Sequence, residues 1–370
     1  MKKTFFPVLA STVAAILAFG GDTKPISIQE IEGRSWLISP HGKPFFAHGV
    51  THLNNPIHRV PHAELGKACR DLGFNAYGYG CPESLKNDMP YIEGRNLVPI
   101  STYRSDGSFK YIDIFDPKEQ QKLARQVEYT CKKNRGNTLL IGYCWTDLAA
   151  WPVEGALGKS WVDFIRELPS DRPGRQVYET FLKSSGDKDN KPARDLNFLR
   201  LIARTYFRIC GETTRKWDPD HLIFGDRFAF PTLVPEVLEE MLPWVDAIAI
   251  QPPFQPGFPK VKFDEIYRLS KKPIIICDYA VRFKDGDKKV RGWKLQENAQ
   301  VAGEQYAEYI RAARATPYIL GVFWCNPIDS KPGFKKTGIK QGIFDAGLRS
   351  RPGLNQAIRK VNVQLKNSQP

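Results

Sequence analysis

Short apolar runs alternate with longer segments of helical period along most of the chain. The runs, rich in β-branched and aromatic residues, occupy 44–50, 74–80, 96–102, 138–145, 221–228, 246–251, 273–278 and 318–324. Amphipathic helical patterns lie between them, most clearly at 63–73, 117–133, 195–217 and 296–315. Strands that alternate with helices are typical of parallel βα units. The pattern therefore predicts an α/β chain folded as a (β/α)8 TIM barrel.

An open, doubly wound parallel sheet is the main alternative to this barrel. Such folds usually bind a nucleotide phosphate at a glycine-rich turn after a strand. Neither GxGxxG nor GxxxxGK[ST] occurs in the sequence. The closed barrel is therefore the preferred prediction.

Residues 1–20 have the pattern of a secretory signal peptide. Two lysines precede an apolar run at 5–18, and Ala18-Phe19-Gly20 is a small-x-small cleavage site. The apolar run is too short to span a membrane. We expect cleavage near Gly20 and an exported protein, secreted or periplasmic, that does not stay in the membrane; an uncleaved anchor is the alternative.

The remaining chain divides into a β-hairpin extension at 21–43, the barrel at 44–365 and a polar tail at 366–370. The extension continues into EGRSWLISPHGKP at 32–44, where a His-Gly turn predicts a hairpin near the bottom of the barrel. Long connections at 148–192, 282–295 and 326–351 all follow strand C-termini. Barrel enzymes build their active sites from loops at that end.

Charge and cysteine content narrow the range of partners. The formal net charge is +14, but the basic residues form no arm or stripe, so nucleic acid is not expected. A basic surface suits a polyanionic polysaccharide, and equally a solvated surface without a partner. The seven cysteines include no CxxC and several lie in apolar runs, which indicates buried thiols, although some could pair after export. No metal ion or other cofactor is expected.

Two of the apolar runs end on an aspartate beside aromatic residues. Asp147 follows LLIGYCWT and Asp278 follows PIIIC. A glycoside hydrolase needs two carboxyl groups flanking one bond, one to protonate the leaving oxygen and one to attack or activate water. Strand C-termini converge in a barrel, so the two acids are candidates for that pair. Alternatively, each caps a helix or pairs with an arginine.

Five segments carry a family resemblance: EGRSWLISPHGKPFFAHGVTHL, GFNAYGYG, LIGYCWTDLAAW, DPDHLIFGDRF and KPIIICDYAVRF. In this order they resemble the catalytic barrel of β-agarase-like glycoside hydrolases, related to family 50 of the retaining TIM-barrel clan. The similarity covers most of 34–345. It implies that strands four and seven supply the acid/base and the nucleophile, and that substrates come from marine galactans such as agarose.

The sequence departs from the pattern of this family at both catalytic positions. The agarases have Asn-Glu after strand four and Glu after strand seven. Asp278 matches the second glutamate, whereas Asp147 matches the asparagine and Leu148 the first glutamate. Asp147 then replaces the acid from one position earlier, Glu154 or Glu83 supplies it, or the site binds sugar without cleaving it. Because aspartate is shorter than glutamate, a wider gap between the acids would favour inversion over retention.

Polar and aromatic residues at the other strand ends are candidates for sugar contacts. Hydrogen-bonding groups recognise hydroxyls, and aromatic rings pack on the apolar face of a pyranose. Taken singly, each could instead be structural. The candidates are His52, Asn54, Asn75, Tyr77, Trp145, Asp226, Arg227, Gln251, Tyr279, Arg282, Trp324 and Asn326.

These observations predict an exported glycoside hydrolase that acts on a galactan-type polysaccharide or oligosaccharide, agarose-like or sulfated. Asp278 would be the nucleophile or base and Asp147 the general acid. Arg282, at the start of the basic segment RFKDGDKKVRGWK, suits a sulfated or carboxylated sugar. The alternatives are a non-catalytic carbohydrate-binding barrel and a polysaccharide lyase with Tyr279 or His52 as base.

Overall fold

The computed structural model describes residues 24–55, 59–98, 110–147, 149, 151, 159–185, 190–230, 233–284, 295–329 and 339–367. The predicted signal peptide lies outside these ranges. None of the helices in the described ranges is long and apolar enough to cross a membrane.

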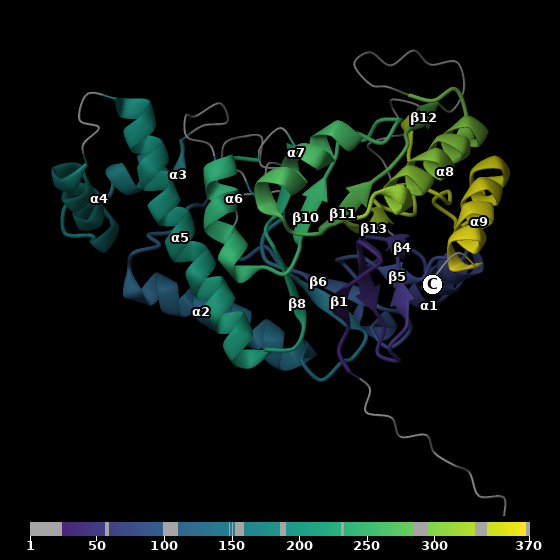
Figure 1. Cartoon of the computed structure of the whole chain (residues 1–370), viewed down its shortest axis with the longest axis horizontal. Helices are drawn as coiled ribbons and strands as arrows, with labels where there is room; N and C mark the ends of the chain where they lie inside the picture. Colours follow the sequence, from purple (N-terminus) through teal and green to yellow (C-terminus); the bar gives the residue numbers. More distant parts are fainter. Residues whose placement is uncertain are drawn as a thin grey trace, which may run out of the picture.

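A sheet of nine parallel strands forms the centre of the molecule, in the order β8-β7-β6-β5-β4-β13-β11-β10-β9 (Figure 1). Only Asp226 separates β8 from β9, so the two edges of the sheet are halves of one interrupted strand and the sheet closes into a barrel. This confirms the predicted (β/α)8 fold. The strands are β4 (Ala47–Val50), β5 (Ala76–Tyr77), β6 (Tyr91–Gly94), β7 (Leu140–Cys144), β8 (Leu222–Gly225), β9 (Arg227–Ala229), β10 (Ile248–Gln251), β11 (Ile274–Tyr279) and β13 (Ile319–Trp324).

Two predicted strands need correction. The third barrel strand is β6, at Tyr91–Gly94, and not the predicted run at 96–102; residues 96–98 lie in the connection after β6, and 99–102 fall outside the described residues. The fifth strand, predicted as continuous over 221–228, is interrupted after Gly225. The positive φ of Gly225, 70°, breaks the extended backbone at that point.

Helices surround the barrel wall (Figure 1). The N-cap aspartate predicted at Asp116 is confirmed, since its side chain accepts from the backbone N–H of Lys118 at the start of α2. The helices are α1 (His62–Asp71), α2 (Pro117–Asn134), α3 (Trp161–Arg166), α4 (Pro173–Ser184), α5 (Lys191–Trp217), α6 (Pro235–Met241), α7 (Lys260–Ser270), α8 (Ala299–Ala315) and α9 (Pro352–Asn367).

Successive side chains of a strand point to opposite faces, and this divides the core into two layers. The inner layer fills the barrel and includes Ile141, Phe224, Ile275 and Phe323. The larger outer layer packs the barrel wall against the helices. Which layer a strand-end residue faces decides whether it can reach a site at the mouth of the barrel.

The N-terminal extension covers the bottom of the barrel. β1 (Ser27–Ile31), β2 (Arg34–Ile38) and β3 (Pro44–Phe45) form an antiparallel sheet. The predicted His-Gly turn joins β2 to β3, and Gly42 adopts a φ of 76° there. Arg34 donates to the backbone carbonyls of Thr316 and Ile319, both at 3.0 Å, where β13 begins. These contacts hold the extension at the end opposite the strand C-termini.

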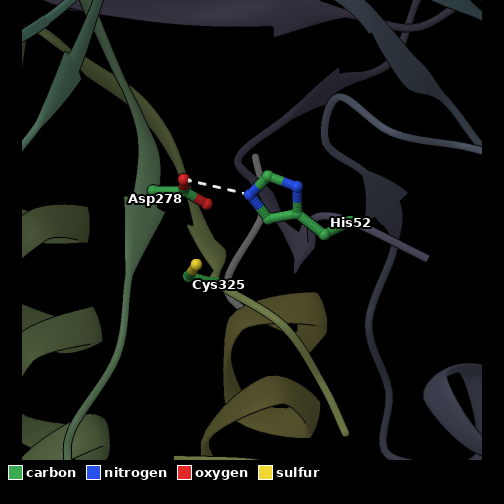
Figure 2. A group of neighbouring side chains, drawn as sticks. All are labelled: His52, Asp278 and Cys325. Carbon is green, nitrogen blue, oxygen red and sulfur yellow. Dashed lines mark hydrogen bonds and ion pairs between the residues drawn. The ribbon is translucent and has the colours of Figure 1, made fainter. Parts of the chain in front are cut away.

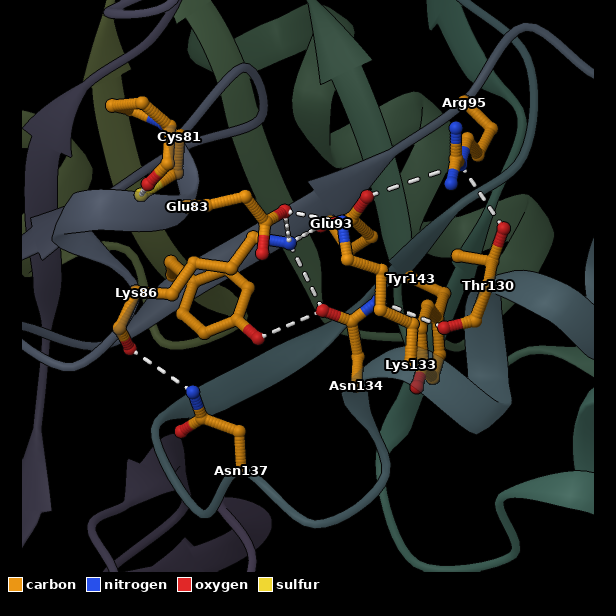
Figure 3. A network of polar contacts seen from close by, with 12 residues as sticks. Cys81, Glu83, Lys86, Glu93, Arg95, Thr130, Lys133, Asn134, Asn137 and Tyr143 are labelled. Atoms are coloured by element: carbon orange, nitrogen blue, oxygen red, sulfur yellow. Dashed lines mark hydrogen bonds and ion pairs between the residues drawn. The ribbon is translucent and has the colours of Figure 1, made fainter.

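Glu83, one of the weaker candidates for the missing acid, belongs to a different part of the surface (Figure 3). It pairs with Lys86 and Lys133, each at 2.8 Å. The same Lys86 ammonium also contacts Glu93 at 2.8 Å and Asn134 at 3.0 Å. Glu83 is therefore part of a structural ion-pair network beside α2. Glu154, the other candidate, lies outside the described residues.

Candidate active site

Asp278 reaches the mouth of the barrel because of an irregularity in β11. Ile275 and Cys277 belong to the inner layer, so simple alternation would turn Asp278 outward. The pairing of β11 with β13 shifts register between Ile276 and Tyr279. A bulge of this kind re-aims a side chain. Asp278 consequently points inward, and Tyr279 packs outward.

Hydrogen-bond donors surround the fully buried Asp278 carboxylate. The Thr51 hydroxyl donates to Oδ1 at 2.6 Å, and the Tyr79 hydroxyl donates to Oδ2. His52 Nε2 lies 3.4 Å from the same Oδ2, and its ring meets the edge of Tyr79 at a centroid distance of 4.7 Å. Both carboxylate oxygens are thus held as acceptors in a fixed orientation.

Cys325 completes the surroundings of Asp278 (Figure 2). It directly follows β13 and is 3% exposed. Burial, and then the charge and hydrogen bonding of Asp278, raise the pKa of the Cys325 thiol well above its usual value. The thiol therefore faces the carboxylate as a neutral donor.

Asp147 belongs to the same cluster through Arg227. The Arg227 guanidinium contacts Asp147 Oδ1 through Nε at 3.0 Å and Nη2 at 2.8 Å. The guanidinium carbon lies 3.5 Å from the centre of the Tyr79 ring, whose hydroxyl contacts Asp278. Asn96 accepts from the backbone N–H of Asp147 at 2.9 Å. The two predicted acids are therefore linked by the chain Asp147–Arg227–Tyr79–Asp278.

Asp226 lies beside Arg227 in sequence but faces the opposite layer. Its carboxylate accepts from Tyr206 of α5 at 3.1 Å and from the indole N–H of Trp151 at 3.3 Å. It is fully buried, and this burial raises the pKa of Asp226 to about 7. Its predicted sugar contact is a misassignment, because the interruption after Gly225 turns it toward the helices.

The side chains of Asn75, just before β5, and Tyr77, on β5, also point away from the mouth. The Asn75 amide donates to the carbonyl of Phe46 at 3.0 Å and accepts from the backbone of His48 at 2.8 Å, near the bottom of the barrel. Tyr77 is buried in the outer layer and donates to Asp88 at 2.6 Å. Both residues have structural roles, so their predicted substrate contacts are corrected.

The aromatic candidates Trp145, Tyr279 and Trp324 pack under the helices. Trp145 stacks on an α5 ring at 6.1 Å, Tyr279 stacks on an α8 ring at 3.6 Å, and Trp324 meets an α8 ring edge-on at 5.4 Å. None is more than 2% exposed. Large apolar rings at strand ends are drawn into the outer layer because burial there removes more of their surface from water. They do not form the sugar platform that the sequence predicts.

The other candidates lie nearer the cluster. Asn54 is exposed on the segment after β4. Gln251 is the last residue of β10, and strand alternation directs its side chain inward. Its buried side-chain oxygen has no hydrogen-bond partner within the described part of the chain. Arg282 Nε donates to Gln341, whose amide donates to the carbonyl of Cys325. Asn326 follows with a positive φ of 55°.

Four residues that the sequence argument missed complete the cluster: Thr51, Tyr79, Asn96 and Cys325. Thr51 and Tyr79 stand next to the predicted pattern, in GVTHL and AYGYG. Alternation would place Tyr79 on the same outward face as Tyr77, so strand periodicity could not have assigned it to the inner layer in which it lies. Asn96 was assigned to a strand. Cys325 carried only the signal of a buried thiol.

Comparisons with known proteins agree with this fold. No family model matches the chain. In sequence, it is 25% identical over 132 residues to β-agarase B of Vibrio sp. (strain JT0107), which covers 36% of this chain and 14% of that protein. An agarase structure matches with a TM-score of 0.75 and 17% identity, over 94% of this chain and 64% of the agarase. An exo-β-agarase structure matches with a TM-score of 0.76 and 14% identity, over 94% and 65%.

The chain therefore spans less than two-thirds of the length of these relatives. The structural likeness extends over 94% of this chain. It confirms the TIM-barrel fold and the resemblance to agarase-like glycoside hydrolases that the ordered motifs indicate.

Proposed function

We propose that this protein is an exported glycoside hydrolase that cleaves a galactan-type polysaccharide or oligosaccharide, agarose-like or sulfated. The observation that carries the proposal is the connected pair of strand-end carboxylates, Asp278 and Asp147, at the C-terminal mouth of the barrel. Active sites of TIM-barrel enzymes lie at this end. The agarases that this chain resembles suggest the substrate class.

In this proposal Asp278 is the nucleophile or the base. Thr51 and Tyr79 orient its two oxygens, so little reorganisation is needed before it meets an anomeric carbon or a water molecule. The same donors stabilise the negative charge of the carboxylate before it reacts. His52, with a side chain 25% exposed, is the member of the cluster that can also reach a sugar hydroxyl.

Asp147 takes the role of proton donor only after its contact with Arg227 changes. Both guanidinium contacts are made to Oδ1, and a carboxylate paired with a guanidinium in this way is a hydrogen-bond acceptor and not a proton donor. A bound sugar that draws Arg227 toward its own oxygens would free Asp147 to carry the proton. Without that change the barrel binds carbohydrate but does not cleave it, which is the second candidate function.

Cationic side chains near the barrel mouth favour an anionic sugar as the substrate. Arg282 lies over the ring of Phe254 and next to Gln341. On the other side, Asn96 also lines a hollow of about 520 Å³ whose wall includes the cationic side chains Arg95, Lys122 and Arg125. Arginine pairs well with flat oxyanions such as sulfate or carboxylate. Of the two bases expected for a lyase, Tyr279 packs under α8, and His52 is left for that alternative.

The test is a reducing-end assay on agarose and on sulfated galactans, with absorbance of unsaturated products followed in parallel. Hydrolysis gives new reducing ends without that absorbance, a lyase gives both, and a binding barrel gives neither. NMR of the first product reports whether the anomer is retained or inverted. For Arg282→Ala, we expect a larger loss on sulfated than on unsulfated substrate; equal losses contradict an oxyanion pocket.

A further inference from the structure

The residues His52, Asp278 and Cys325 come from three different strand ends and bring three kinds of metal-ligand atom together (Figure 2). One imidazole nitrogen, one carboxylate oxygen and the thiol sulfur lie within 4.8 Å of one another. We propose that this trio is a binding site for a zinc-like divalent cation, and that the bound cation competes with substrate for Asp278. No sequence motif marks this site, because His52 lies 226 residues before Asp278 and Cys325 belongs to a third strand end.

The donor set and spacing suit zinc. Zinc takes imidazole nitrogen and carboxylate oxygen at about 2.0–2.2 Å and thiolate sulfur at about 2.3 Å, in tetrahedral geometry, so neighbouring ligand atoms are about 3.4–3.6 Å apart. The distance from His52 Nε2 to Asp278 Oδ2, 3.4 Å, already matches. The sulfur needs to approach by about 1 Å at most, and the partly exposed His52 gives the ion a path to the site.

Supporting hydrogen bonds of the kind that orient metal ligands are also present. Thr51 and Tyr79 donate to the Asp278 oxygens, and each carboxylate oxygen keeps a second lone pair for an ion. His52 has a φ of 60°, which is uncommon for a residue other than glycine, and its backbone N–H bonds the carbonyl of Tyr79 at 2.9 Å. The backbone is thus held in an unfavourable conformation that presents the imidazole to Asp278.

Binding requires the Cys325 thiol to lose its proton to solvent, since thiolate is the ligand form. The charges near this thiol are Asp278 and Asp147, which oppose ionisation, and Arg282, which favours it. A bound divalent cation favours the thiolate over the thiol. The two carboxylates then help to hold the cation, Asp278 by binding it directly and Asp147 by electrostatic attraction. Three protein ligands leave the fourth position open toward the mouth, where water or a sugar hydroxyl can bind.

The binding test uses cobalt(II) as a spectroscopic probe on the full chain and does not depend on enzymatic activity. We expect one equivalent of cobalt to produce a thiolate-to-cobalt charge-transfer band, and zinc to abolish that band by displacement. The band should be absent in Cys325→Ser and should need at least about tenfold more cobalt in His52→Gln. The matched controls are Cys131→Ser, another buried thiol, and His41→Gln, an exposed histidine; both should behave as the unmodified protein.

A band of equal strength in Cys325→Ser, or no band in the folded unmodified protein, overturns the site; circular dichroism establishes folding in each case. The competition rests on the proposed hydrolase function and is tested separately. Zinc should suppress product formation by the unmodified protein, and a chelator should restore it, whereas Cys325→Ser should resist. If the cobalt band is present but no substrate is cleaved, the site stands and the proposed function fails.

Discussion

Two buried aspartates at strand ends, Asp278 and Asp226, differ in the layer that they face. Both are completely inaccessible to solvent. The bulge in β11 turns Asp278 into the barrel mouth, where hydroxyl and imidazole groups meet it. The interruption between β8 and β9 turns Asp226 outward, where Tyr206 and Trp151 are its partners.

Burial alone therefore does not identify a functional acid. Burial raises the pKa of Asp226 to about 7. Perturbed acids are often functional, but structural networks perturb them too. Asp278 is the better candidate because it lies at a strand C-terminus beside the partly exposed His52. The irregularity in each strand sets which layer the aspartate side chain faces, and this layer determines whether the carboxylate can contact a substrate.

The largest expected effect separates the two aspartates by activity. Asp278→Asn should lower the rate of substrate cleavage by about 10²–10⁴-fold, because the amide can neither attack nor accept a proton. Asp226→Asn should leave the rate within about threefold, since its side chain does not reach the mouth. Initial rates of reducing-end formation, with thermal unfolding as the folding control, provide the measurement. Equal losses in both variants would remove the distinction.

The next effect concerns stability at the mouth itself. Arg227→Met leaves Asp147 as a buried carboxylate without its cation, and we expect a loss of about 3–5 kcal/mol in the free energy of unfolding. The double variant Arg227→Met/Asp147→Asn should recover much of that loss, because the uncompensated charge is gone. Urea unfolding of both proteins measures the difference. Similar destabilisation of the single and double variants would mean that packing, and not charge, dominates.

The smallest expected effect is a pH dependence of the free energy of unfolding that arises from Asp226. The pKa of Asp226 is raised on folding, so the folded state keeps a proton that the unfolded chain releases. Its contribution to stability is therefore complete below the unfolded pKa of about 4 and is lost as the pH rises toward about 7.

Asp226→Asn should remove this part of the pH dependence and flatten the stability curve between those limits. Urea unfolding at several pH values, for the variant and the unmodified protein, measures the change. An unaltered slope would mean that Asp226 is ionised in the folded protein despite its aromatic surroundings.

The order of barrel strands and helices could be predicted from sequence, because periodicity and N-capping are local properties. The sequence also indicated the strand ends at which Asp147 and Asp278 stand. It misplaced the third strand, since the apolar run at 96–102 has the composition of a strand whereas the pairing with β5 and β7 is made by Tyr91–Gly94.

Which strand-end side chains meet depends on the packing of distant strands and helices. Trp145, Tyr279 and Trp324 were expected at the mouth but pack under α5 and α8, and Tyr79 and Cys325 reach Asp278 instead. A shift of one residue in a strand moves a side chain to the other face. Bulges introduce such shifts through pairing with distant strands, so the composition of the site depends on contacts that local sequence patterns do not encode.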